Sequence, residues 1–121
     1  MTTFQTPTGI IVTKFNRLTQ NVTLDIFTAV NLEMVEFVRF VNIASGTPNV
    51  TLDVYDGTIA YNLLTTHTLL AAGTESTEAN LDKSTYRIDG PIMVPIGWKL
   101  RALTNGTTND VHVFTTHVSR R

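Results

Sequence analysis

The chain has 121 residues, of which 42% are hydrophobic and 16% charged, with a formal net charge of −1 and no cysteine. This length fits one domain with a single core, and the apolar content excludes a disordered chain. A net charge near zero gives no field to attract a polyanion, so nucleic acid is not an expected partner, and the lack of cysteine excludes disulfides and thiolate chemistry.

The first eight residues, Met1 to Thr8, form a polar segment in which Phe4 is the only large apolar group after Met1. They lack the basic start and the apolar stretch of a signal peptide, so we expect a chain that starts in a cytosol. The longest nearly apolar run, residues 34–43, is interrupted by polar residues and is much shorter than the roughly 20 residues of a membrane span, so no membrane is expected as a partner. Taken by itself, the opening segment is typical of a frayed terminus.

Side chains that alternate between apolar and polar predict strands along most of the chain, because successive residues of a strand point to opposite faces. Val111, Val113, Thr115 and His117, for example, fall on one face of the last strand. The expected strands cover residues 10–15, 22–26, 34–43, 50–55, 59–64, 86–89, 92–94, 98–102 and 111–118, and residues 67–72 are a candidate for a further short strand.

Turn signals separate these strands. Asp56-Gly57 and Asn105-Gly106 predict tight turns, Gly90-Pro91 and Pro95-Ile96-Gly97 predict corners, and residues 73–84 predict a surface loop. About eight short strands at this spacing predict an all-β fold, an antiparallel β-sandwich of the jelly-roll type.

Residues 34–43 differ from the other strands because both faces are apolar. Strict alternation puts Val35, Phe37, Val41 and Ile43 on one face and Met34, Val38 and Phe40 on the other. Such a strand lies under a loop or meets another chain with its outer face. Val38 and Phe40 are therefore candidate partner-binding residues, although the sequence does not decide which face is core.

Catalytic and metal-binding patterns are not found. His112 and His117 are expected to face opposite sides of one strand, and the pairs Asp53 with Asp56 and Glu75 with Glu78 supply only part of a calcium shell. No nucleophile elbow or phosphate-binding glycine cluster occurs. We expect no catalytic residue, no metal, no cofactor and no enzymatic activity. Trp98 with the tyrosines could form a sugar platform, but Trp98 shares a face with Leu100, which favours packing.

Two segments resemble recurring units of small bacteriophage virion proteins. Residues 35–57, VEFVRFVNIASGTPNVTLDVYDG, are similar to a two-strand unit in which an apolar strand ends in Asn, followed by a small-residue turn and an alternating strand. Residues 90–118, GPIMVPIGWKLRALTNGTTNDVHVFTTHV, are similar to the closing unit with its Pro-x-Gly corner. Together the two segments cover about half of the chain, and they carry no residue-specific functional motif.

The resemblance to the capsid-decoration members implies a role as a non-enzymatic cement protein. Such a protein is made in the host cytoplasm, binds the major capsid protein on the outer surface of the virion head, and is often a homotrimer. The chain then divides into an N-terminal arm, residues 1–9, with Phe4 as an anchor on a neighbouring protein, and one β-sandwich domain, residues 10–121. A tail, baseplate or head-to-tail adaptor protein is the first alternative, and a carbohydrate-binding module is the second.

Overall fold

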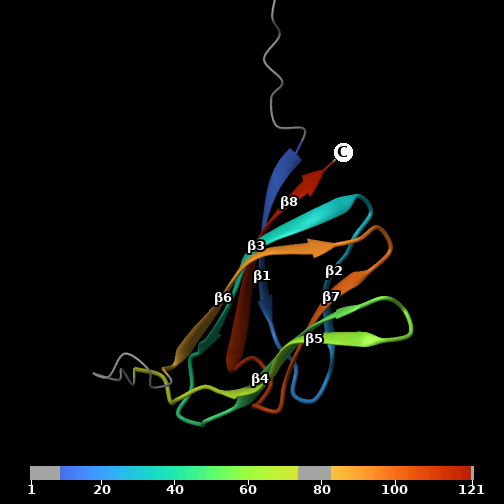
Figure 1. The fold of residues 1–121 in the computed structure, drawn as a ribbon. Coiled ribbons are helices and arrows are strands. Elements are labelled where there is room, and N and C mark those ends of the chain that lie inside the picture. Colours follow the sequence, from blue (N-terminus) through green and yellow to red (C-terminus); the bar gives the residue numbers. More distant parts are fainter. Residues whose placement is uncertain (1–8, 74–82, 121) are drawn as a thin grey trace, which may run out of the picture.

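The computed structural model describes residues 9–73 and 83–120 and shows eight strands in two antiparallel sheets (Figure 1). No helix occurs in these two ranges, which confirms the predicted all-β sandwich. The strands are β1 (Gly9–Arg17), β2 (Leu24–Thr28), β3 (Leu32–Asn42), β4 (Asn49–Tyr55), β5 (Ala60–Thr68), β6 (Thr85–Val94), β7 (Lys99–Thr104) and β8 (Val111–Arg120).

The strand order defines a jelly roll. One sheet has the order β1-β8-β3-β6 and the other has the order β2-β7-β4-β5. Consecutive strands change sheet along the chain, except at the β4–β5 hairpin. The first and last strands are therefore neighbours, and two Greek keys cover one shared core.

A bulge between β3 and β6 changes the expected pattern twice. The register shifts between Val35 and Phe37, where Gly90 and Pro91 lie on the opposite strand. A Cβ on Gly90 would collide with the backbone oxygen of Val35, so only glycine allows this close approach. The two short segments expected at 86–89 and 92–94 therefore form one continuous strand, β6.

The same bulge corrects the face assignment of residues 34–43. Val35 and Val38 are both fully buried although they are three residues apart, because Glu36 is an extra residue of β3 that has no counterpart on β8. From Val38 onward the core side continues with Phe40 and Asn42. Strict alternation fails here because the extra residue of a bulge reverses which side chains of the strand point to the core beyond it.

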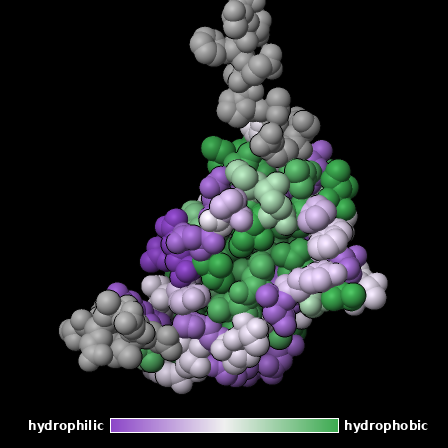
Figure 2. Space-filling view, viewed as in Figure 1, coloured by the Kyte–Doolittle hydropathy of each residue, from purple (hydrophilic) through white to green (hydrophobic). Residues whose placement is uncertain are grey.

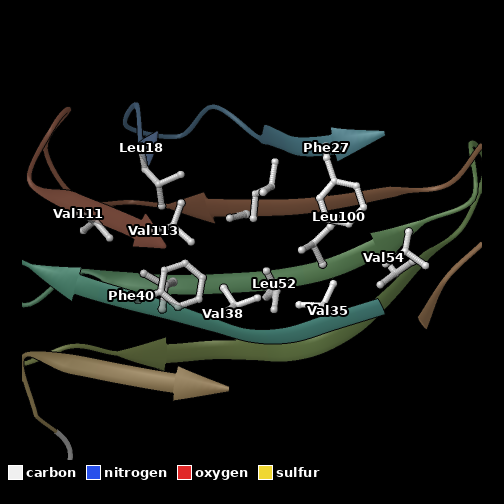
Figure 3. Close-up of a cluster of buried hydrophobic side chains, with 14 of the residues drawn as sticks. Leu18, Phe27, Val35, Val38, Phe40, Leu52, Val54, Leu100, Val111 and Val113 are labelled. Carbon is white, nitrogen blue, oxygen red and sulfur yellow. The ribbon is translucent and has the colours of Figure 1, made fainter. Parts of the chain in front are cut away.

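The core lies between the two sheets and contains side chains from both (Figure 3). In β8 the predicted face is confirmed, since Val111, Val113, Thr115 and His117 are all buried. Each fully buried Val, Leu or Phe side chain stabilises the fold by about 1.5–3 kcal/mol. The fully buried apolar residues include Leu18, Val35, Val38, Phe40, Val50, Leu52, Leu69, Val94, Leu100, Val111 and Val113.

The turn between β4 and β5 is held by Asp56. Its Oδ1 accepts hydrogen bonds from the backbone N–H groups of Ile59 and Thr58, both at 2.7 Å. These bonds favour the charged carboxylate and lower the pKa of Asp56 from its ordinary value of 3.8. Gly57 follows with φ of 105°, which glycine adopts without strain, so the Asp-Gly turn predicted from the sequence is present.

Candidate interaction surface

The outer face of the β1-β8-β3-β6 sheet carries a row of apolar side chains beside charged residues such as Arg39, Arg87 and Asp89. Pairing across the four strands aligns Ile11, Val118, Met34 and Met93 in one row that faces away from the core. The side chain of Ile11 is 72% exposed and that of Met93 is 47% exposed. Met34 and Val118 between them are partly buried, and a row of four apolar residues with exposed ends is the kind of surface that meets another molecule.

Aromatic side chains extend this surface along the strands. Phe15 is 71% exposed and packs edge-on against Phe114, with ring centroids 5.2 Å apart. Phe37 lies under the Arg87 guanidinium, whose central carbon is 4.3 Å from the ring centroid. We call the whole surface the apolar face, and its members are Ile11, Phe15, Met34, Phe37, Met93, Phe114 and Val118.

The outer face of the β2-β7-β4-β5 sheet is polar, and its charges are paired. Arg101 donates to both carboxylate oxygens of Asp53, at 2.8 and 3.3 Å, and stacks over the Tyr55 ring at 3.8 Å. The bond to Asp53 raises the pKa of Arg101 above its ordinary value. Lys99 forms a second ion pair with Asp25 at 2.9 Å. This surface, which we call the polar face, is suited to water.

Between β5 and β6 the sandwich is open, and an apolar area fills the middle of the view in Figure 2. Leu64 of β5 and Ile88 and Ile92 of β6 are only partly buried against the core. The rings of His67 and Tyr86 stack with centroids 3.8 Å apart and join the two sheets across this opening. Leu64, Ile88 and Ile92 therefore form a second apolar surface.

The predicted partner-binding residues do not all lie on a surface. Val38 and Phe40 are fully buried in the core (Figure 3), which leaves no side-chain area for a partner, so they are corrected to core residues. Phe4 and the predicted arm fall outside the described residues apart from Gly9, which begins β1. The expectation of a covered outer face fits other residues of β3, namely Met34 and Phe37.

Sequence reasoning missed most of the apolar face. Apolar side chains at Phe114 and Val118 already alternate with the core residues of β8, so two-sided character was visible in that strand as well. Ile11 and Phe15 join the surface only because β1 pairs with β8, at the other end of the chain.

Glu33 and His117 make contacts that hold the fold together. Glu33 Oε2 lies 3.0 Å from His117 Nδ1, and Glu33 Oε1 accepts a hydrogen bond from Ser119 at 2.9 Å. Ser119 bonds the carboxylate rather than the imidazole, so the three residues do not form a nucleophile-activating relay. His117 also stacks on Phe27 with centroids 4.3 Å apart, whereas His112 faces the other side of β8, as predicted.

Metal ligands do not converge in the described part of the chain. Within residues 9–73 and 83–120, no group of three or more His, Cys, Asp or Glu side chains could hold a metal ion. Asp53 pairs with Arg101, and Asp56 accepts backbone N–H groups in its turn. Glu75 and Glu78 lie outside these ranges. In the same two ranges, no helix is long and apolar enough to cross a membrane.

The four aromatic residues proposed for sugar binding lie in three separate contacts. Trp98 stacks on Tyr61 with centroids 5.5 Å apart, Tyr55 packs under Arg101, and Tyr86 packs on His67. Trp98 is also packed against the core. A platform of several coplanar exposed rings is therefore not formed by these four residues.

A polar hollow of about 420 Å³ lies where three loops meet at one end of the sandwich. Gln20, Thr47 and Asp110 are part of its lining. The loops are held by side-chain hydrogen bonds: Asn105 Oδ1 accepts from the Asn49 N–H at 2.7 Å, and the Asn42 amide donates to the Leu70 carbonyl at 2.8 Å. The hollow is thus a preformed feature of the loop end.

No protein-family model matches the chain, and no curated protein matches it. Two solved structures, both crystal structures of a pentameric capsid protein isolated from metagenomic phage sequences, are similar to it. They share 14% and 15% identity with TM-scores of 0.44 and 0.45, over 93% of this chain in both cases. The chain spans about three-fifths of their length, 60% and 61%. Similarity at this level assigns no function.

Proposed function

We propose that the protein is a non-enzymatic structural protein of a bacteriophage virion that decorates the outside of the head and stabilises it. The resemblance of residues 35–57 and 90–118 to virion β-sandwich units supports the class of protein. The apolar face is the single observation that supports attachment, because a sheet that met only water would carry polar side chains there.

The strength of attachment follows from burial and repetition. Covering Ile11, Phe15 or Met93 completely would contribute up to about 1.5–3 kcal/mol each, before the cost of association is subtracted. A net charge of −1 contributes little long-range attraction. A cement protein with modest affinity per copy becomes firmly attached when many copies bind a repeating lattice.

Binding to heads tests the role. We expect the protein to sediment with undecorated heads, and we expect Met93→Glu to weaken this binding because it places a charge in the apolar face. Ile96→Glu is the matched control, since Ile96 is 68% exposed and lies outside this face. If the protein does not co-sediment with heads, decoration is contradicted and a tail, baseplate or adaptor position is favoured.

We also propose that the protein is a homo-oligomer, with three copies as the resemblance implies. Leu64, Ile88 and Ile92 are partly exposed and lie outside the apolar face. They give a physical reason for self-association, because an apolar surface lowers solubility unless another surface covers it. Sedimentation velocity at micromolar concentration measures the mass. A monomer would contradict the homo-oligomer, and a stable assembly of another size would contradict only the trimer.

The N-terminal arm is a separate proposal. We expect deletion of Met1 to Thr8 to leave the melting temperature unchanged, because this segment lacks the alternating pattern of the core strands, and to weaken binding to heads. Unchanged binding of the truncated protein would reject the arm and move the contact to the loops around Gly46 to Pro48 or to residues 73–84.

A further inference from the structure

Three of the four sheet edges carry features that hinder pairing with another strand. The edge strand β2 has only five residues and a register shift between Asp25 and Phe27. β5 pairs irregularly with β4 at two places, and Thr66 has a φ of 43°. β6 contains Pro91, which has no N–H group, beside the bulge. Short length, bulges and proline are common protections of an exposed edge.

The edge strand β1 lacks these three features, although it carries two charged residues, Lys14 and Arg17. Its nine residues pair with β8 in an unbroken register from Gly9 to Arg17. It contains no proline, and its most exposed apolar side chains are Ile11 and Phe15. Among the described residues β1 pairs only with β8, so alternate N–H and C=O groups along its other edge have no strand partner.

We propose that the free edge of β1 binds β1 of a second copy, antiparallel and about a two-fold axis. The two β1-β8-β3-β6 sheets then form one continuous eight-stranded sheet. This contact is isologous, because the same residues contribute from both copies. It also continues the apolar face of one copy into that of the other.

The sequence of β1 is self-complementary when Thr13 lies opposite Thr13 of the second copy. With Thr13 opposite Thr13 of the second copy, Ile11 lies opposite Phe15 on the outer face, and this apolar pair occurs twice. Lys14 lies opposite Val12, and Arg17 lies opposite Gly9, so no like charges face each other. A register shifted by two residues, with Lys14 opposite Lys14, opposes two positive charges, which is unfavourable.

The size of the contact predicts its strength. Nine residues at about 3.4 Å each give a contact about 30 Å long, and a sheet layer is about 10 Å thick, so each copy covers roughly 300 Å². Stable complexes cover about 800 Å² on each partner. We therefore expect a weak dimer with a dissociation constant of roughly 0.1 mM, which becomes effective where copies are concentrated.

Pairing through β1 does not depend on the proposed binding to a head. A two-fold contact forms dimers in solution without a head, and it joins assemblies in pairs if another surface closes a trimer. Binding to heads and pairing through β1 can therefore fail independently of each other.

Opposite charges at Thr13 test the two-fold contact directly. Thr13 is exposed, so neither Thr13→Lys nor Thr13→Glu disturbs the core. Each variant alone opposes two like charges across the axis, and we expect at least a tenfold loss of self-association by sedimentation velocity between 0.02 and 1 mM. An equimolar mixture of the two variants should restore association, because unlike charges then face each other. Thr65→Lys, an exposed threonine on the protected edge strand β5, is the matched control and should associate like the wild type.

Hydrogen exchange gives a second measurement on the unaltered chain. We expect protection of β1 amides to rise with protein concentration over the same range, while protection of β5 amides stays constant. The proposal is overturned if both Thr13 variants associate as the wild type does, if the mixture associates no better than either variant alone, or if β1 protection is independent of concentration.

Discussion

The outer faces of the two sheets differ in how their side chains are satisfied. On the polar face, Arg101, Asp53 and Tyr55 contact one another, and Lys99 pairs with Asp25. The outer face of the other sheet also has an ion pair, between Arg87 and Asp89, but there Ile11 and Phe15 are more than two-thirds exposed. Because one sandwich carries both faces, strand propensity does not explain the contrast. The proposed attachment to a head through the apolar face would explain it.

The two faces are also expected to contribute differently, the polar face to stability and the apolar face to association. Ion pairs within the polar face connect neighbouring strands of the same chain, so their loss should lower the free energy of unfolding. Exposed apolar groups of the apolar face gain little from folding, so their loss should change association more than stability. The following changes test this separation.

The largest effect is expected beneath the apolar face, where neighbouring residues of β3 have opposite environments. Val38 is fully buried, so Val38→Asp places an unpaired charge in the core and should lower the free energy of unfolding by about 3–5 kcal/mol. Arg39 is exposed on the outer side, and Arg39→Asp should change it by less than about 0.5 kcal/mol. Urea denaturation measures both, and similar effects of the two changes would contradict the register of β3.

A smaller effect is expected on the polar face. Asp53→Asn removes the charge that pairs with Arg101, and we expect a loss of about 1 kcal/mol, because both side chains are about four-fifths buried. Asp25→Asn is the control, since its pair with Lys99 is more exposed and should contribute no more than about 0.5 kcal/mol. Equal losses in thermal unfolding would show that burial does not distinguish the two pairs.

Polar substitutions on the apolar face should hardly change stability. The double variant Ile11→Thr with Met93→Thr should alter the free energy of unfolding by about 0.5 kcal/mol or less while reducing binding of a hydrophobic dye. Val30→Thr with Ile96→Thr is the control, because these exposed apolar residues lie outside the apolar face. Equal reductions in dye binding by the two double variants would remove the distinction between the face and scattered apolar residues.

The smallest effect concerns pH at the β4–β5 turn. Asp56 has a folded-state pKa lowered by the N–H groups of Ile59 and Thr58, so its contribution to stability is present above the ordinary value of 3.8 and lost as pH falls through the folded value. The difference in melting temperature between wild type and Asp56→Ala should therefore be small at pH 7 and shrink below pH 3.8. Asp56→Asn, which keeps an acceptor oxygen, is the control. A difference that grows toward low pH would contradict this sign.

Much of the fold could be predicted from local pattern. Alternation fixed which side of β8 is buried, and Asp56-Gly57 located a turn, because side-chain direction and turn conformation depend on neighbouring residues alone. The bulge opposite Gly90 could not be predicted in this way. It depends on the approach of β6 to the Val35 carbonyl, more than 50 residues away, and it moved Val38 and Phe40 from candidate contacts to the core.

The sequence by itself determined that the chain forms an all-β sandwich with an apolar surplus in its third strand, because periodicity and turn residues are local properties. Only the tertiary structure decided where that surplus is exposed. Ile11, Val118, Met34 and Met93 form one row because a jelly roll places the first strand beside the last and the third beside the sixth. Such a surface depends on strand pairing between distant segments, which no local pattern encodes.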